Sequence, residues 1–501
     1  MKKPLSSSSN FGHHSGARDK RKKEAFDMQS VKTSFKSRLL GGVFALAGGL
    51  ALPQAISAET LADALVGAYN HSGLLEQNRA LLRAADEDVA IAGAALKPVV
   101  RWTASATQSF GRVKTAATAS AVSNDDLTAS LSLIAELLIY DSGARKFRID
   151  ATKETVLATR DALVNVEQQV LLRAIASYMG VIEASEFVAL RNNNVRLLTQ
   201  ELRAARDRFE VGEVTRTDVA LAEAQLAQAR SGLAGAQGDR QRAIEEYRNA
   251  VGHTPGQLAP PPTLPSTGQD IDAAKALAVR RHPLLLSAQH QVAASDLLTS
   301  ASEADMGPQV NLTSRYGLSE SLGTSNFNHS GSVGIEAGQT IFQGGRLSAA
   351  VRQNKARSDA QRANLHIVQH DLQQSVGNAY ANLNSAKAQL AASERQIRAA
   401  RIAFRGIREE AALGARTTLD VLDAEQSLLD AQSLQVSARS NLYVAAYTML
   451  SSTGQLTVKD LKLPVQTYDP AAYYNLVKDS PAKLTKQGRA LDRVLKSLQK
   501  N

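Results

Sequence analysis

The chain has 501 residues, of which 44% are apolar, 5% are aromatic and none is cysteine. The absence of cysteine from the sequence excludes a disulfide scaffold, a thiolate metal site and a cysteine nucleophile. The formal net charge of +10 would favour a polyanionic partner, but this charge is concentrated at the two ends of the chain. Residues 1–57 carry a net charge of +7 and residues 456–501 one of +5, which leaves −2 for the residues between them. A nearly neutral central part gives no support to a nucleic-acid partner.

The N-terminal segment has the parts of a secretory signal peptide in their usual order. Basic residues ending at Arg38 precede the apolar run Leu39–Leu52, and small residues follow it up to Ala58. This run is too short to span a membrane as a helix. We therefore predict that residues 1–57 are a signal peptide. Because the segment before the run is unusually long, we also predict that translation starts at Met28.

No later apolar run is long enough for a membrane-spanning helix, which needs about 18 residues. A chain of this kind could cross a membrane only as part of a closed β-barrel, because an open sheet cannot satisfy its edges in lipid.

The rest of the chain consists of one unit that occurs twice. Residues 143–252 and 345–454 align without a gap at an offset of 202 and share 24 identities. In both copies apolar residues recur every seven positions. Both also interrupt this pattern with a step of eleven residues, which ends at Val181 in the first copy and at Leu383 in the second. An irregularity shared in this way indicates a duplication.

Each copy contains a long tract without proline, between Pro98 and Pro255 and again between Pro308 and Pro464. The heptad pattern predicts one long helix in each tract, about 100 Å in length, which is matched in length by two short helices. The predicted helices are residues 60–96, 143–211 and 215–250 in the first copy and residues 271–306, 345–413 and 416–452 in the second.

Between the first short helix and the long helix, the apolar period changes from helical to alternating, which is typical of strands. Each copy therefore contains one predicted hairpin with a long polar loop. The predicted strands are residues 100–110 and 127–137 in the first copy and residues 310–318 and 332–341 in the second, with loops at 113–126 and 321–329.

Four strands per chain cannot close a barrel, so closure requires several copies of the chain. Two copies would supply eight strands and three copies twelve. A packed eight-stranded barrel leaves little room for solutes, so the trimer is the arrangement that gives both closure and a lumen.

These patterns predict the following domains. The first repeat covers residues 58–262, with a β-hairpin at about 99–142 and a helical hairpin at 143–252. The second repeat covers residues 263–457, with a β-hairpin at about 309–344 and a helical hairpin at 345–454. Residues 458–501 form a basic tail whose apolar residues are too sparse to predict a core, and we expect this tail to lie outside the barrel.

Several motifs resemble those of the TolC-like outer membrane efflux proteins. The strand-to-helix junctions read IYDSG at 139–143 and QTIFQGG at 339–345, and the helical turns read VGEVTRTDV at 211–219 and LGARTTLDVLD at 413–423. Together with the duplication, they extend the resemblance over essentially the whole mature chain.

The resemblance implies an α+β membrane protein that forms a homotrimer. Its twelve-stranded β-barrel lies in the lipid of the outer membrane and continues as a periplasmic α-helical barrel. This channel-tunnel meets an inner membrane ABC or RND pump through a periplasmic adapter, also called a membrane fusion protein. Because the sequence shows no catalytic or cofactor-binding motif, we expect neither enzymatic activity nor a cofactor. Since this chain has no cysteine to acylate, it looks more like the non-lipidated members that serve type I protein secretion.

The resemblance also implies roles for the two helical turns. Arg416 would link to Thr217 and Asp218 of the other turn and so hold the periplasmic entrance closed. Gly212 and Gly414 most simply supply the left-handed backbone that reverses each helix. The docking of the adapter at these turns is implied by the resemblance alone. A solvated local ion pair between Arg416 and Asp420, four residues further along the chain, is the alternative that the residues alone allow.

Two further groups of side chains have the spacing of a site. Asp420 and Asp423 are three residues apart on one helical face, so a trimer would place six carboxylates around a narrow lumen. An acidic surface patch is the alternative. His366 and His370 have a spacing that can bind a metal, but no third ligand accompanies them, and we expect no metal there.

The sequence therefore predicts a passive exit duct in the outer membrane with a large periplasmic part. The alternative from another class of protein is a structural coiled coil at the cell surface, such as an adhesin stalk, which would need heptads but no duplicated hairpin. An envelope enzyme would need a catalytic cluster or a cofactor fingerprint, and the sequence contains neither.

Overall fold

The computed structural model describes residues 58–498, except 115, 116, 118, 119, 269, 324 and 484. The predicted signal peptide and Met28 lie outside these residues. The first half of the chain contains α1 (Leu61–His71), α2 (Gly73–Ala94), β1 (Val99–Val113), β2 (Val122–Tyr140), α3 (Ala144–Glu210) and α4 (Arg216–Val251). The second half contains α5 (Ile271–Arg281), α6 (Pro283–Ala304), β3 (Gln309–Ser321), β4 (Phe327–Gly338), α7 (Arg346–Ala412), α8 (Thr418–Ser452), α9 (Pro470–Val477) and α10 (Lys486–Leu498).

The two long helices, α3 and α7, have 67 residues each and occupy equivalent positions in the two repeats. Each begins after a glycine with positive φ, Gly143 at +89° and Gly345 at +79°. The long helices that the heptads predict are therefore present to within a residue at each end. Each long helix packs against short helices along its length, α3 against α2, α4, α6 and α8, and α7 against α5, α6 and α8.

The predicted short helices before the strands are each divided in two, which corrects the single helices expected at 60–96 and 271–306. Between α1 and α2, Ser72 has an extended backbone, and its hydroxyl accepts a hydrogen bond from the N–H of Leu75. Between α5 and α6, His282 is extended because Pro283 disfavours a helical residue before it. The imidazole of His282 then accepts a hydrogen bond from the N–H of Leu284 and so begins α6.

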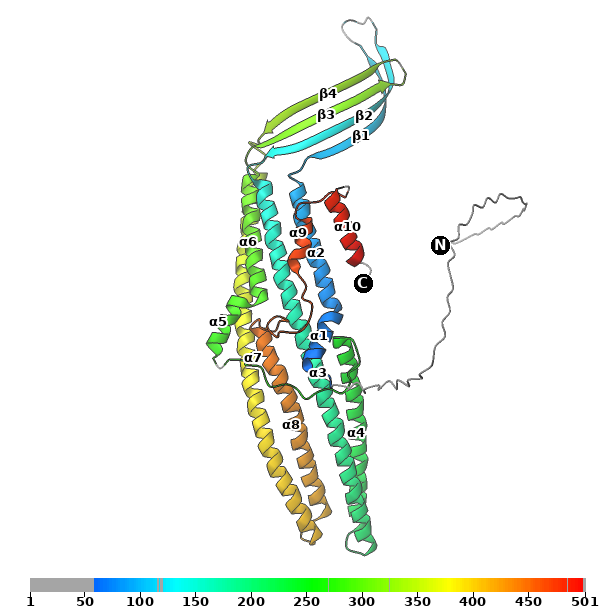
Figure 1. Ribbon diagram of the computed structural model, residues 1–501, viewed down its shortest axis with the longest axis vertical. Coiled ribbons are helices and arrows are strands. Elements are labelled where there is room, and N and C mark those ends of the chain that lie inside the picture. The colour runs from blue at the N-terminus through cyan, green and yellow to red at the C-terminus, as the bar shows by residue number, and fades with distance from the viewer. Residues whose placement is uncertain are drawn as a thin grey trace, which may run out of the picture. The chain divides into compact units, whose positions relative to one another are not determined.

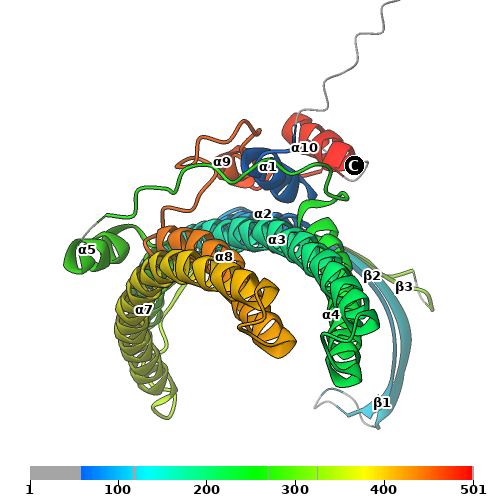
Figure 2. The ribbon, with the colours of Figure 1, turned by 90° about the horizontal axis from the view of Figure 1, so that it is seen from below.

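The helices α7, α8, α3 and α4 lie side by side in that order and form an arc when seen along their length (Figure 2). The helix pairs α3–α4 and α7–α8 are the two helical hairpins, and the contact of α8 with α3 joins them. None of the helices in the described part of the chain is both long and apolar enough to cross a membrane.

The four strands form one curled antiparallel sheet in the order β1-β2-β3-β4 (Figure 1). Val99 pairs with Glu136 at one end of the first hairpin and Val113 with Val122 at the other. The strands extend into the polar stretches predicted as loops, since β3 continues to Ser321 and β4 already begins at Phe327. The cross-strand ladder continues through the polar residues of these stretches, and it pairs Ser123 with Arg112 and Ser319 with Asn328.

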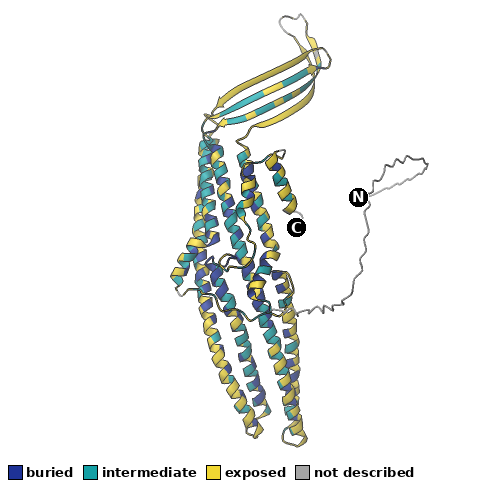
Figure 3. Ribbon diagram, viewed as in Figure 1, coloured by how far each residue is buried: buried dark blue, intermediate teal, exposed yellow. Residues whose placement is uncertain are grey.

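The two outer strands of the sheet, β1 and β4, are exposed along their whole length (Figure 3). Large apolar side chains are among these exposed residues, for example Trp102 at 71%, Phe110 at 85% and Val333 at 76%. Apolar surface of this extent on a sheet marks a face that another apolar phase or chain covers.

The C-terminal segment packs on the helices, which corrects the expectation that its apolar residues form no core. Val458 is buried in the cluster around α1, α2 and α3, and Leu461, Leu463 and Val465 pack against this cluster. Tyr473 and Val477 of α9 are buried against Ala90 of α2. Sparse apolar residues suffice here because they insert into an existing surface and need not form a core by themselves.

Candidate functional site

The two helical hairpins end in turns that have the same backbone, at the lower end of the view in Figure 1. Gly212 has φ of +78° and Gly414 has φ of +79°. The N–H of Gly212 donates to the carbonyl of Phe209 at 3.0 Å, and that of Gly414 donates to Ala411 at 3.1 Å. Any other residue would be strained at either glycine, as the sequence predicts.

Each return helix begins with the same reciprocal cap. The N–H of Thr215 donates to the Asp218 carboxylate at 2.9 Å, and the N–H of Asp218 donates back to Thr215 Oγ1 at 3.3 Å. Thr417 and Asp420 repeat this arrangement at 2.9 and 3.2 Å. Hydrogen bonds from Thr215 lower the pKa of Asp218, and those from Thr417 lower the pKa of Asp420. Both aspartates thus hold helix starts, a role that the sequence analysis did not assign to them.

Arg416 bonds within its own hairpin. Its Nε donates to Glu410 Oε2 at 2.9 Å, and this pair raises the pKa of Arg416. Within one chain the partner of Arg416 is thus Glu410, because the turn at Gly414 brings Arg416 back over the last turn of α7. The duplication contained a signal for Glu410. This residue aligns with Arg208 of the first copy, so the two copies carry opposite charges at this position.

A cleft of about 550 Å³ lies between the two turns. Arg208 and Asp218 line it from the first hairpin, and Leu413 and Arg416 line it from the second. Thr217 is exposed in the first turn of α4. The structure thus places Arg416 and Asp218 along one cleft, while the bonds described above keep each of them within its own turn.

Asp420 and Asp423 lie one helical turn apart at the start of α8. Asp420 is half-buried and bonded to Thr417, whereas Asp423 is exposed. Of the two carboxylates, only that of Asp420 serves as a cap, so the two aspartates differ in how freely they could act on a passing ion.

Glu425 follows Asp423 by two residues and was missed by the sequence analysis. It is 4% exposed, and its Oε1 accepts a hydrogen bond from Asn194 of α3 at 2.7 Å. Burial raises the pKa of Glu425 to about 7. The duplication carried a signal here, because Glu223 occupies the same position in the first copy.

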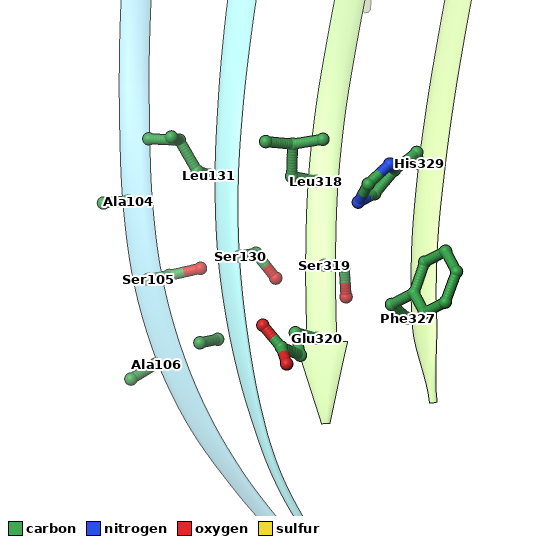
Figure 4. A pocket seen from close by; sticks show the side chains of 11 residues that line it. Ala104, Ser105, Ala106, Ser130, Leu131, Leu318, Ser319, Glu320, Phe327 and His329 are labelled. Atoms are coloured by element: carbon green, nitrogen blue, oxygen red, sulfur yellow. The ribbon is translucent and has the colours of Figure 1, made fainter. Parts of the chain in front are cut away.

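A second hollow, of about 520 Å³, lies on the curled sheet and is lined from all four strands (Figure 4). In Figure 4, Phe327 and His329 stand at one side on β4, small residues such as Ala104 lie at the other side on β1, and Glu320 lies between β2 and β3. The hollow follows the curvature of the sheet and does not converge on a reactive group. Within the described residues, no cluster of three or more His, Asp or Glu side chains could hold a metal ion, and His366 and His370 are exposed on α7.

The model of the outer membrane efflux protein family matches the chain twice, over residues 66–253 and 276–455. The outer membrane efflux protein BepC of Brucella suis is 34% identical over 89% of this chain and 97% of its own. The alkaline protease secretion protein AprF of Pseudomonas aeruginosa is 26% identical over 68% of this chain and 72% of its own. The solved outer membrane channel CmeC of Campylobacter jejuni is 14% identical and shares the fold, with a TM-score of 0.71 over 83% of this chain and 89% of that chain.

Proposed function

This chain belongs to the outer membrane efflux protein family, and we propose that three copies of it form a passive exit duct in a tripartite efflux or type I secretion system. It is an outer membrane protein with a large periplasmic part, as its relatives are. The family consists of channels, so the work of transport falls to an energised partner. An adhesin stalk is no longer a competing function, because both repeats match the efflux family.

The proposal of a trimer rests on the open edges of the sheet. Its edge strands β1 and β4 are exposed throughout, and apolar side chains cover much of their surface. A sheet in lipid must pair every edge. Three copies would pair β1 of one chain with β4 of the next and close a barrel of about twelve strands, which leaves a lumen.

The helical hairpins would extend this barrel into the periplasm. The arc of α7, α8, α3 and α4 is a sector that a threefold axis could complete into a tube (Figure 2). At its end the turns at Gly212 and Gly414 would dock a periplasmic adapter, which connects the duct to an inner membrane ABC or RND pump. The boundaries predicted from the sequence, repeats at 58–262 and 263–457 after a signal peptide at 1–57, are part of this proposal, as is a periplasmic place for residues 458–501.

The gate would lie at the cleft between the turns. In a closed trimer Arg416 of one hairpin would reach Thr217 or Asp218 of a hairpin beside it, and the exposed ion pair with Glu410 is weak enough to exchange. Asp420 and Asp423 of three chains would form the acidic ring just inside the entrance.

Cross-linking of the protein extracted in mild detergent tests the assembly. We expect a species of three times the chain mass that falls to the monomer on heating. Circular dichroism of the separated species is the control. A stable detergent-solubilised monomer that keeps its full strand content would contradict the proposed barrel.

A further inference from the structure

The contact of α8 with α3, which joins the two hairpins, is an apolar seam near the turns. Leu422 packs with Leu198 and Leu202 of α3, and Leu429 is buried one helical turn beyond Glu425. Residues 422, 425 and 429 have the three-and-four spacing of one helical face. Glu425 is therefore a carboxyl group at a position where its neighbours on the seam are leucines.

The carboxyl group of Glu425 is only half satisfied in this seam. Asn194 bonds to Oε1, whereas Oε2 is buried and has no hydrogen-bond partner among the described residues. The charged groups that act on it are Glu201 of α3 and Arg408 of α7, which pair with each other at 3.2 Å. Since the charge of Arg408 is shared with Glu201, it does not compensate that of Glu425. A buried carboxyl group without a compensating charge favours the contact between α8 and α3 only when it is protonated.

A cavity of about 460 Å³ adjoins Glu425 between α3 and α8. Its polar lining consists of Asn193, Asn194, Arg196, Gln200, Glu425 and Gln432. Arg196 donates to Asn193 and is exposed. The cavity gives water a path to the seam, so a proton can reach Glu425 without unfolding of either helix.

The duplication allows Glu425 to be compared with the equivalent residue of the first repeat. Glu223 occupies the same position on α4, but its side chain is 50% exposed and pairs with Arg206 of α3. The same residue is thus buried in the second copy and solvated in the first, because α8 lies between α7 and α3 whereas α4 ends the arc. The burial of Glu425 results from the joining of the hairpins, not from the repeated sequence.

We propose that Glu425 is a proton-binding site between the two hairpins, and that its proton holds α8 against α3 beside the turns. The loss of this proton leaves an uncompensated charge in an apolar seam, and the hairpin of α7 and α8 loosens there. The effect of this loosening on the duct rests on the proposed function, since α8 begins beside Arg416. The proton-binding site itself does not depend on the proposed function.

The direction of the pH dependence follows from burial. The folded-state pKa of Glu425 is raised from 4.5 to about 7, so the contact is strongest below the ordinary value and weakens as the pH rises through 7. The ionised share of such a group changes from ~10% to ~90% between about pH 6 and pH 8. Most of the loosening should fall in that window.

A spin label tests the proposal in the full-length chain, which has no cysteine of its own. Ser427 is exposed on α8 close to Glu425, and Ser427→Cys would carry the label. We expect the mobility of the label to rise between pH 6 and pH 8. With Glu425→Gln or Glu425→Met, it should stay low at every pH. With Glu223→Gln, it should titrate as in the parent. A label at Gln225→Cys, the counterpart on α4, should show no such change.

A parent label that does not respond to pH, or one that responds equally with Glu425→Gln, would overturn the proton site. Conductance in planar bilayers, recorded across the same pH range, tests the link to the duct. It should rise with pH in the parent and not in Glu425→Gln, and a label that titrates while conductance stays constant would overturn the regulatory part. If the chain forms no channel at all, the proposed function fails, while the label still decides whether Glu425 binds the proton.

Discussion

Asp218 holds the start of α4 through Thr215 and also lines the cleft that Arg416 lines. A test of the gate must separate these two roles. We predict that Arg416→Ser combined with Asp218→Ala raises the resting conductance of single channels, because the links proposed to close the entrance would be lost. Trimer yield should stay the same, since neither side chain is buried.

The matched control for the gate is Thr215→Ala, which removes the same cap at a cost of ~1 kcal/mol but keeps the Asp218 charge. Its conductance should remain that of the parent. If Thr215→Ala opens the channel as much as the double variant does, loss of the helix start explains the effect. If neither variant conducts more than the parent, Arg416 and Asp218 do not close the entrance.

The stability of the fold should also depend on pH through Asp86 of α2, which lies far from the turns. It is fully buried, neither carboxylate oxygen has a hydrogen-bond partner among the described residues, and Arg160 lies 3.8 Å away. Burial raises the pKa of Asp86 from 3.8 to about 6. Its contribution to stability is therefore fully present below pH 3.8 and is lost as the pH rises through about 6, by at most ~3 kcal/mol.

We predict that Asp86→Asn removes this loss, so that Tm declines less between pH 5 and pH 7 than in the parent. Asp88→Asn, an exposed change on the same helix, should leave the parent profile unaltered. Thermal unfolding followed by circular dichroism gives the comparison. Parallel profiles for Asp86→Asn and the parent would show that Asp86 keeps its ordinary pKa.

At the scale of elements, α9 and the segment before it form part of the helical core. The hydroxyl of Tyr69 accepts a hydrogen bond from the N–H of Tyr468, and Tyr473 is buried against α2. We predict that deleting residues 466–501 lowers Tm, because apolar surface on α1 and α2 becomes exposed. Tyr473→Ala alone should lower the free energy of unfolding by ~3 kcal/mol or more, as the truncation of a large buried side chain does.

Leu476→Ala is the control for the tail, because Leu476 lies on the same helix and is 45% exposed. Its effect on Tm should be small. An unchanged Tm after the full deletion would mean that the tail only rests on the helices. Cross-linking of the same variants shows whether assembly also depends on it.

The sequence predicts best those elements whose apolar periodicity extends over many residues. Heptads over 67 residues place α3 and α7, and strict alternation places the strands. The breaks at Ser72 and His282 were not predicted, because one capping side chain or one proline before a helix leaves the apolar period almost unchanged. The packing of α9 was missed because its partner surface is remote in sequence, on α2.

Within the candidate site, the sequence predicts the glycine turns, since positive φ is a local property of the chain. It does not predict that Arg416 pairs with Glu410, or that Glu425 is buried. Both depend on how a turn or a neighbouring helix is placed, and the spacing of residues on one helix carries no such information. The duplication held the best clue, since it aligns Glu410 with Arg208 and Glu425 with Glu223.

At the scale of the assembled molecule, three copies would gather the exposed Asp423 side chains around one axis. We predict that Asp423→Ala lowers cation selectivity and weakens block by multivalent cations, because a ring of carboxylates concentrates cations within about 8 Å at physiological salt. Asp420→Ala is a less clean variant, since it also removes the cap of α8. Reversal potentials in salt gradients measure the effect, and unchanged potentials for Asp423→Ala would place this carboxylate outside the lumen.

The open edges of β1 and β4 also bear on how the protein reaches its membrane. A lone chain exposes two rows of unpaired backbone groups beside Trp102, Phe110 and Val333, which is the chemistry of strand-to-strand aggregation. Correct pairing competes with every other edge in the compartment, and its yield depends on the concentration of chains. Overproduction should thus favour insoluble material over inserted protein, and a holding chaperone that covers strand edges should shift the balance back.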